Sequence, residues 1–270
     1  MSEALSPESV ISDLPEWQGA TTTKLSNGLT NETWLLQNGN RKAVLKIDER
    51  PRQAPYNSRL DEAAVQSLAA EAGLASNVLF ADSRIYVAEY VEGSPWNPDD
   101  LDRPGKIEQL ASALRRLHTI PRTGRSFDAI AAAQQYVQTI EYSDKQLVNH
   151  CMGVIKKTPL PNYLCFSHND LVAENIITTP ELKFIDWEFA CDNNPMFDLA
   201  TIVEHHELNE NQTLSLLEKY FGGSGERWRS QLVEQQRLYL ALYWMWLASR
   251  PDSSNRELKR LAERVTTSCS

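Results

Sequence analysis

A histidine, an aspartate and an asparagine stand between two apolar runs in the middle of the chain. His168 and Asp170 follow the first run, and Asn175 comes immediately before the second. A further acidic residue, Asp186, follows the next apolar run, at residues 182–185. Phosphoryl transfer requires a carboxylate that orients and deprotonates a hydroxyl, together with carboxylate and amide oxygens that bind Mg²⁺. The spacing therefore predicts a magnesium-dependent site formed by Asp170, Asn175 and Asp186.

Alternating apolar and polar residues predict an antiparallel sheet in the first ninety residues. Asn38-Gly39, between two of the alternating segments, is typical of a tight hairpin. Ser58 as an N-cap, with Asp61 three residues later, predicts one helix that ends at Gly73. The expected strands are residues 21–25, 32–37, 43–47 and 84–91.

Helical periodicity dominates from residue 94 onward, apart from a β-rich segment at residues 164–186. The expected fold class is therefore α+β. An N-terminal lobe, residues 1–93, carries the antiparallel sheet and its single helix, and a mainly helical lobe spans residues 94–270. Ligands commonly bind where two such lobes meet, so a cleft is expected there.

Composition excludes several classes of function. The 270 residues carry 27 Lys+Arg against 36 Asp+Glu, a net charge of −9, which argues against a nucleic-acid partner. Phosphate compounds still fit, because Mg²⁺ can bring a phosphate into an acidic site. The N-terminus does not resemble a signal peptide, and the longest apolar run, residues 238–248, is too short to span a membrane. Four scattered cysteines predict reduced thiols in a cytoplasmic protein.

The order of these motifs resembles the aminoglycoside phosphotransferase and choline kinase superfamily, whose members are relatives of protein kinases. His168, Asp170 and Asn175 match its catalytic loop, and Ile-Asp-Trp-Glu at residues 185–188 matches its metal-binding segment. The resemblance implies a protein-kinase-like fold with ATP and Mg²⁺ as cofactors. It implies that Asp170 is the catalytic base and that Asn175 and Asp186 bind the metal, with Glu188 as a further metal contact. His168 is expected to be a structural residue of the loop.

The resemblance extends to nucleotide-binding residues in the first lobe. Lys46, at the end of an expected strand, matches the lysine that contacts the α- and β-phosphates of ATP. Glu62 matches the helix glutamate that pairs with this lysine. The turn over the phosphates has a single glycine where protein kinases have three. The remaining expected nucleotide contacts, in this turn and in the hinge beside the adenine, are Asn27, Gly28, Thr30, Asn31, Glu89, Tyr90 and Val91.

The same resemblance suggests a small cationic alcohol as the phosphate acceptor, with choline first and ethanolamine next. The His-Asn-Asp form of the loop and the segment Asn-Asn-Pro-Met-Phe-Asp resemble the bacterial choline kinases. Tyr243 and Trp246 share one face of an aromatic-rich helix that resembles the lining of the choline pocket. A quaternary ammonium binds to aromatic faces, at ~2 kcal/mol for a desolvated contact. Glu204 is a candidate counter-charge. The same aromatic helix also fits a purely structural role in the core.

Three alternatives remain open at this point. A thiamine kinase would suit the same aromatic pocket, because thiamine is also a cationic alcohol. A pseudokinase-like module would bind a cation without turnover. A metal-dependent hydrolase would use His168, Asp170 and Asp186 but would leave Lys46 and Glu62 without a role. The sequence fixes neither the preference between ATP and GTP, nor the oligomeric state, nor the pathway.

Overall fold

The computed structural model describes residues 5–27, 32–52, 55–140, 144–251 and 253–267. The chain divides into two compact units. The first comprises Met1–Pro95 and Ile176–Ala190, and the second comprises Trp96–Asn175 and Cys191–Ser270. The first break lies two residues beyond the boundary expected from the sequence. The segment Ile176–Ala190, which follows Asn175 directly, packs with the first unit.

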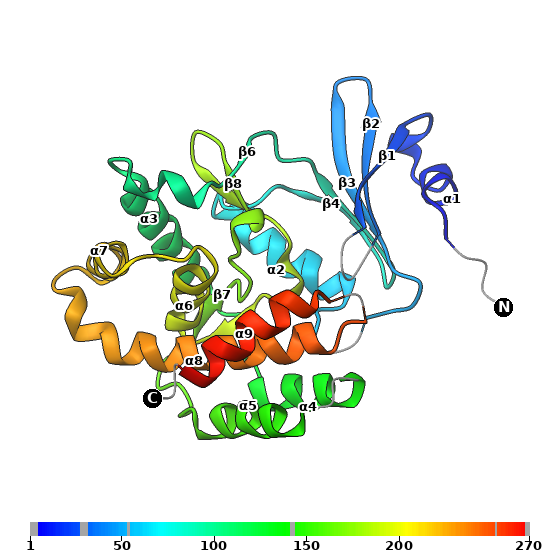
Figure 1. Ribbon diagram of the computed structural model, residues 1–270. Coiled ribbons are helices and arrows are strands. Elements are labelled where there is room, and N and C mark those ends of the chain that lie inside the picture. Colours follow the sequence, from blue (N-terminus) through cyan, green and yellow to red (C-terminus); the bar gives the residue numbers. More distant parts are fainter. Residues whose placement is uncertain (1–4, 28–31, 53–54, 141–143, 252, 268–270) are drawn as a thin grey trace. The chain divides into compact units, whose positions relative to one another are not determined.

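The first unit is built on a five-stranded antiparallel sheet with the strand order β1-β2-β3-β5-β4 (Figure 1). The four expected strands are present, and β4 is an addition. Asn38 pairs with Arg41 across a two-residue turn, and Gly39 has a φ of 61°, as the first position of a type II′ hairpin turn requires. The strands are β1 (Thr21–Asn27), β2 (Glu32–Asn38), β3 (Arg41–Ile47), β4 (Val78–Ala81) and β5 (Ile85–Glu89).

The helix α2 (Arg59–Glu71) packs against β4, β5 and the short turn at Trp187–Phe189. Its expected N-cap is confirmed, because the Ser58 side chain accepts a hydrogen bond from the backbone N–H of Asp61. The first turn of α2 buries Arg59 and Glu62 completely, although both are charged. Charged side chains are almost never fully buried unless they are paired. This helix therefore carries paired charges into the interior of the unit.

A small hairpin returns to the first unit from far along the chain. Its strands β8 (Ile176–Thr178) and β9 (Leu182–Phe184) pair with each other, and β8 also pairs with β6 (Ser94–Pro95). The backbone N–H of Phe184 donates to the carbonyl of Leu74 at 2.7 Å. A Cβ on Gly93 would lie 2.6 Å from Ile177, so only glycine fits where the chain passes this hairpin. These contacts fix the segment that ends in Asp186.

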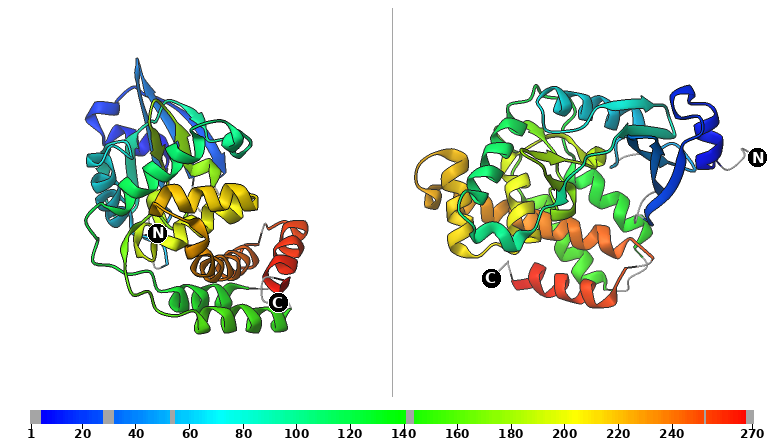
Figure 2. Two further views of the ribbon diagram at one scale, coloured as in Figure 1. Left: turned by 90° about the vertical axis from the view of Figure 1, so that its left-hand side faces the viewer. Right: turned by 90° about the horizontal axis from the view of Figure 1, so that it is seen from above.

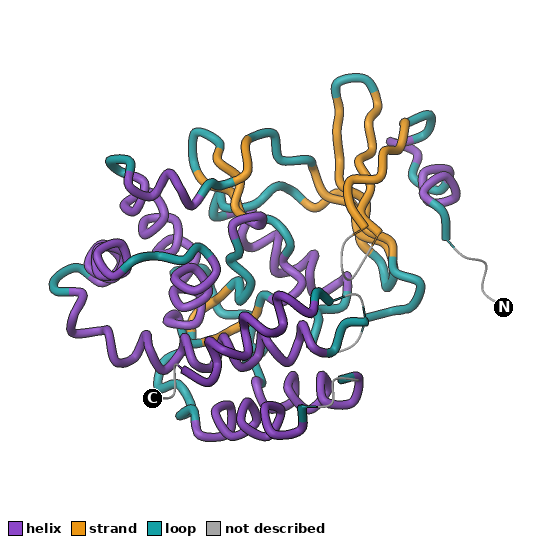
Figure 3. Tube along the Cα trace, viewed as in Figure 1, coloured by secondary structure: helices purple, strands orange, loops and turns teal. Residues whose placement is uncertain are grey.

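The second unit is mainly helical, which with the sheet of the first unit gives the expected α+β class (Figure 3). The long helix α8 passes through its core, and α9 lies alongside α8 (Figure 2). Two strands of three residues each, β7 (Cys165–Ser167) and β10 (Cys191–Asn193), pair antiparallel, and the loop that carries Asp170 follows β7. The helices of this unit are α3 (Lys106–His118), α4 (Ala129–Thr139), α5 (Lys145–Lys157), α6 (Pro195–His205), α7 (Glu210–Phe221), α8 (Arg229–Ala248) and α9 (Asn255–Thr267).

Three further features of the described chain bear on the expectations above. A short helix, α1 (Pro7–Ser12), precedes the first sheet and was not expected. Within the described residues, no helix combines the length and the apolar character needed to cross a lipid bilayer. Cys151 and Cys165 are buried and Cys191 is half-buried, and all three are free thiols.

Candidate active site

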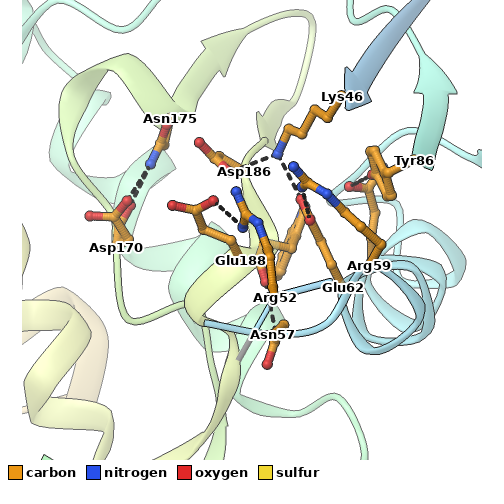
Figure 4. Close-up of polar contacts among 12 residues, drawn as sticks. Lys46, Arg52, Asn57, Arg59, Glu62, Tyr86, Asp170, Asn175, Asp186 and Glu188 are labelled. Atoms are coloured by element: carbon orange, nitrogen blue, oxygen red, sulfur yellow. Dashed lines mark hydrogen bonds and ion pairs between the residues drawn. The ribbon is translucent and has the colours of Figure 1, made fainter. Parts of the chain in front are cut away.

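Lys46 on β3 holds two carboxylates of the first unit (Figure 4). Its Nζ donates to Oε1 of Glu62 on α2 at 2.7 Å and to Oδ1 of Asp186 at 2.7 Å. Burial alone would lower the pKa of Lys46, but Asp186 and Glu62 outweigh burial, so the pKa lies above its ordinary value. The expected pairing of Lys46 with Glu62 is therefore present, and Asp186 joins it through the same ammonium group.

Asp186 lies two residues after the end of β9 and has a left-handed backbone with a φ of 66°. Aspartate tolerates this conformation better than most residues, but it still costs ~1–2 kcal/mol. The surrounding chain holds the conformation: Nδ2 of Asn57 donates to the carbonyls of Trp187 and Ala190, each at 3.0 Å. The Asp186 side chain is 36% exposed, so its carboxylate remains accessible to a ligand.

Glu188, the other acidic residue of this segment, is engaged by an arginine. Nη1 of Arg52 donates to its Oε2 at 2.6 Å, and the Glu188 side chain is 5% exposed. Burial raises the pKa of Glu188 to about 6, and the nearby carboxylate of Asp186 acts in the same direction. The sequence suggested that Glu188 contacts either a second metal ion or the residues around the metal. In the structure the Glu188 carboxylate is paired with Arg52. A contact between Glu188 and a metal ion stays a prediction.

Asp170 and Asn175 form a second cluster, within the second unit (Figure 4). The amide nitrogen of Asn175 donates to Oδ2 of Asp170 and to the backbone carbonyl of Asp170, both at 2.9 Å. Two bonds to one residue fix the Asp170 carboxylate relative to its own backbone. Both bonds use the amide nitrogen of Asn175, so its amide oxygen points away from Asp170. This oxygen could then serve as a metal ligand.

Asp198 on α6 anchors the loop that presents Asp170. Its carboxylate is fully buried and accepts from the backbone N–H groups of Asn169 at 2.7 Å and His168 at 3.0 Å. It also lies 3.0 Å from Nε2 of His118, whose Nδ1 is 2.6 Å from the hydroxyl of Tyr220. The backbone of Asn169 is left-handed, with a φ of 65°. His168 is fully buried, as a structural residue of this loop would be.

We expect the substitution Asp198→Asn to destabilise the protein by ~2–3 kcal/mol, because an amide offers one oxygen where two backbone N–H groups and His118 now bind a carboxylate. Urea denaturation followed by circular dichroism measures this loss. The control is Asp99→Asn, at an exposed aspartate near the start of a short turn. Equal denaturation midpoints for the two variants would contradict the anchoring role of Asp198.

The aromatic residues of α8 border a small cavity of about 100 Å³ in the second unit. Tyr243 stacks on Trp246 with ring centroids 6.0 Å apart, and both rings are half-buried. Trp244 is fully buried and packs in the core. Of the three expected substrate contacts, Tyr243 and Glu204 line the cavity, whereas Trp246 stacks on Tyr243 and is not part of the lining. The lining is Glu204, His205, Glu207, Tyr239, Tyr243, Glu257, Arg260, Leu261 and Arg264.

Two carboxylates of this cavity differ in what they bind. Glu204 is paired with Arg264 and accepts from the Gln236 amide, although burial raises its pKa. A carboxylate already neutralised in this way is a weaker counter-charge for a cationic ligand. Glu257 on α9 accepts from the Tyr243 hydroxyl at 2.9 Å. The sequence analysis missed Glu257, although its spacing from Arg260 and Arg264 places the three on one helical face.

The remaining expected nucleotide contacts are only partly described. Gly28, Thr30 and Asn31 lie outside the described residues, and Asn27 ends β1 opposite Glu32. In the expected hinge, the backbone N–H of Glu89 donates to the carbonyl of Asn77 and that of Tyr90 to the carbonyl of Lys42. An adenine contact at Glu89 or Tyr90 would therefore use a carbonyl oxygen, or else the backbone of Val91.

Both clusters lie within the part of the sequence that matches a known protein family. The sequence profile described as the phosphotransferase enzyme family matches residues 21–232, which include Lys46, Glu62, Asp170, Asn175 and Asp186. The chain belongs to this family. The match ends within the first turn of α8, so residues 233–248 of α8 and all of α9, which line much of the cavity, lie beyond the shared part.

Individual relatives of this phosphotransferase agree with the assignment. Protein LicA of Haemophilus influenzae is 29% identical over 239 residues, which cover 81% of this chain and 70% of that protein. The thiamine kinase of Salmonella typhimurium is 26% identical over 204 residues, covering 73% of this chain and 70% of the relative.

Solved structures confirm the protein-kinase-like fold that the sequence suggested. The crystal structure of choline kinase LicA from Streptococcus pneumoniae aligns over 96% of each chain, with a TM-score of 0.81 and 20% identity. A structure of LicA in complex with AMP aligns with a TM-score of 0.80, again over 96% of each chain and at 20% identity. At this level of identity the likeness establishes the fold.

Proposed function

We propose that this phosphotransferase uses ATP and Mg²⁺ to phosphorylate the hydroxyl of a small cationic alcohol, with choline as the first candidate and ethanolamine as the next. The observation that carries the proposal is the bridge from Lys46 to both Glu62 and Asp186. A buried ammonium held between a helix carboxylate and an accessible carboxylate suits the binding of a polyphosphate next to its metal ion. A hydrolase that acts without a nucleotide would have no use for this arrangement.

The reaction assigns a simple task to Asp170. The hydroxyl oxygen of the acceptor attacks the γ-phosphorus of ATP, the bond from that phosphorus to the β,γ-bridging oxygen breaks, and ADP leaves. The hydroxyl proton passes to the Asp170 carboxylate, which Asn175 holds in place through its amide nitrogen. Most of the acceleration comes from placement and charge stabilisation, because the protein forms no covalent bond with the substrate.

The residues present fit a magnesium ion. Mg²⁺ prefers oxygen ligands, and the accessible carboxylate of Asp186 and the amide oxygen of Asn175 are such ligands. When bound, the ion neutralises negative charge on the phosphates. Asp186 belongs to the first unit and Asn175 to the second, so their joint action on one ion is part of this proposal.

The choice of a cationic alcohol rests on the cavity beside α8 and α9. Tyr243 offers an aromatic face, and Glu257 places a carboxylate against its hydroxyl. A quaternary ammonium donates no hydrogen bonds, so aromatic faces and nearby carboxylates are its natural hosts. The structural relative named as a choline kinase supports choline as the first acceptor to test.

We expect Tyr243→Ala to raise the KM for choline ~10-fold and to leave the KM for ATP unchanged, because a desolvated cation–π contact contributes ~1–2 kcal/mol. Steady-state kinetics with coupled detection of ADP measure both constants. Trp228→Ala is the control, because Trp228 stacks on Phe221 at the other end of α8. An unchanged KM for choline in Tyr243→Ala would remove this cavity from the acceptor site.

Thiamine is the second candidate, because a named thiamine kinase is 26% identical to this chain over 204 residues. The experiment that separates the candidates offers choline, ethanolamine, thiamine and an aminoglycoside in parallel, each with ATP and Mg²⁺, and measures ADP release. We expect the highest kcat/KM with choline. Faster turnover of thiamine would replace choline as the acceptor. If ADP–Mg²⁺ binds and no acceptor is phosphorylated, the chain is a cation-binding module without turnover.

A further inference from the structure

Seven charged side chains of the first unit form one continuous line of ion pairs, which we call the charge chain. Figure 4 labels all of its members except Asp48. It starts at Asp186, passes through Lys46 to Glu62, and continues from Glu62 to Nη1 of Arg59 at 2.5 Å. Arg59 then binds Asp48 through two nitrogens, at 2.7 and 2.8 Å.

Arg52 links Asp48 to the last member of the charge chain, Glu188. Nε of Arg52 donates to Asp48 at 3.2 Å, and Nη1 donates to Glu188 at 2.6 Å. The order of the chain is therefore Asp186, Lys46, Glu62, Arg59, Asp48, Arg52 and Glu188, with the sign of the charge alternating at every step.

The two ends of the charge chain lie on the same short turn of the backbone. Asp186 and Glu188 are two residues apart, whereas the five members between them come from β3, the segment after it and the first turn of α2. The backbone holds the turn as well, because the N–H of Asn57 donates to the carbonyl of Glu188 at 2.7 Å. Lys46 therefore holds the turn at Asp186, and Arg52 and the backbone of Asn57 hold it at Glu188.

Arg52 is well suited to hold this turn. Its side chain is 8% exposed and lies with its guanidinium carbon 5.5 Å from the centre of the Tyr56 ring. The Tyr56 ring in turn packs against Phe189 with centroids 4.9 Å apart. Buried guanidinium groups hold a carboxylate in a fixed geometry better than lysine does, because their donors form a rigid fork.

The charge chain contains four carboxylates and three cationic groups, so it carries one negative charge in excess. Asp186 is 36% exposed, and the side chains of the other six are between 0% and 9% exposed. The excess charge is therefore accessible at the Asp186 end. A carboxylate fixed in this way is prepared for a cation before the cation arrives.

We propose that Arg52 is a positioning residue for the metal-binding turn. By holding Glu188 it fixes the turn in which Asp186 lies, and in this way it sets the affinity for Mg²⁺ bound with a nucleotide. Glu188 is then the partner of Arg52 rather than a ligand of the metal. This inference rests on the proposed function, because it assigns Asp186 to a magnesium ion.

The test compares ADP binding with and without Mg²⁺ by isothermal titration calorimetry, in the full chain and in variants. In Arg52→Gln we expect the tightening of ADP binding by Mg²⁺ to fall ~10-fold or more, since residues outside the ligand set that fix the orientation of a metal ligand contribute ~10–100-fold to metal affinity. ADP binding without Mg²⁺ should change less than ~3-fold, because Lys46 and Glu62 stay in place. Arg52→Lys keeps the charge and should recover part of the loss.

A double-mutant cycle with Glu188→Gln isolates the proposed contact. If Arg52 acts through Glu188, then Arg52→Gln has no further effect on the magnesium dependence in the Glu188→Gln background. Arg41→Gln is the matched control, because Arg41 pairs with Glu16 at an exposed site of the same unit. Thermal unfolding of each variant verifies that it is folded at the temperature of the titration.

Several outcomes would overturn the inference. These are an unchanged magnesium dependence in Arg52→Gln, an equal loss of ADP affinity with and without Mg²⁺, or additive effects of the two substitutions. Failure of the proposed function looks different, because the wild-type protein would then not bind ADP more tightly with Mg²⁺. If wild-type binding does depend on Mg²⁺ and none of the four acceptors is phosphorylated, the proposed turnover fails, and the titrations of the Arg52 variants still decide the role of Arg52.

Discussion

Asp170→Asn is expected to lower kcat by ~10²–10⁴-fold, the range that a positioned general base contributes, while ADP–Mg²⁺ binding and folding persist. Asparagine has nearly the same shape as aspartate, and its amide oxygen can still accept the hydrogen bond that Asn175 now donates to Oδ2 of Asp170. The substitution therefore removes the proton acceptor and leaves the loop in place. Rapid-quench measurement of phosphorylated product in a single turnover reports the chemical step directly.

The matched control for this prediction is Glu174→Gln. Glu174 lies four residues after Asp170 in the same loop, and its side chain is 76% exposed. It should behave as wild type in kcat and in ADP binding. A kcat for Asp170→Asn within tenfold of the wild-type value would exclude Asp170 as the base. A parallel loss of ADP–Mg²⁺ binding would instead indicate a role for Asp170 in nucleotide binding.

The sheet of the first unit could be predicted because its strands obey local rules. The apolar residues of β2 and β3 and the hairpin turn at Gly39 between these strands are visible in the sequence. β4 was missed because Val78–Ala81 has no alternation and exposes Leu79 and Phe80 at the edge of the sheet. β10 was missed because Cys191–Asn193 has weak strand propensity and becomes a strand only by pairing with β7.

The core of the candidate site could be predicted only as far as the family's motifs extend. Lys46 and Glu62 were paired correctly, and the contact of Lys46 with Asp186 was not expected. Asp48, Arg52 and Arg59 were missed altogether. Charged residues in a loop and in the first turn of a helix are usually solvated, and nothing local in the sequence marks these three as buried. Their burial depends on partners up to 136 residues away in the sequence.

The cavity between α8 and α9, which we propose for the acceptor, was predicted least well, for a related reason. Of the two α8 residues expected to line it, Tyr243 does, whereas Trp246 stacks on Tyr243 and is not part of the lining. The polar lining comes largely from α9, whose charged face resembles that of any solvated helix when it is seen alone. Only the packing of α9 against α8 shows that Glu257 faces Tyr243.

Lys46→Met is expected to reduce kcat/KM for ATP by ~10²-fold or more and also to destabilise the protein by ~3–5 kcal/mol near neutral pH. The thioether has nearly the length of the lysine side chain and carries no charge, so it leaves Glu62 and Asp186 without their shared cation. Glu62 is completely buried, and a buried carboxylate that loses a cationic partner is costly. Urea denaturation and ATP kinetics measure the two losses separately.

The loss of stability should depend on pH with a defined sign. Burial alone would raise the pKa of Glu62, but Lys46 and Arg59 outweigh it and hold the pKa below its ordinary value. In the wild type this stabilisation is present at neutral pH and is lost as the pH falls through the depressed pKa of Glu62. In Lys46→Met the positive charge of Lys46 no longer opposes the effect of burial, so the pKa of Glu62 rises. Protonation of Glu62 then favours the folded state. The deficit relative to wild type should therefore shrink as the pH is lowered from neutral toward the ordinary range of a carboxyl group.

Two further variants make the prediction specific to the buried pair. Lys42→Met removes a lysine of the same strand whose partner, Glu92, is exposed, and it should change stability little. The double variant Lys46→Met with Glu62→Gln should be more stable than Lys46→Met alone, because it leaves no uncompensated charge at Glu62. If the single and double variants unfold at the same urea concentration at every pH, then the Glu62 charge is not what makes the loss of Lys46 costly, and the reasoning from the buried pair fails.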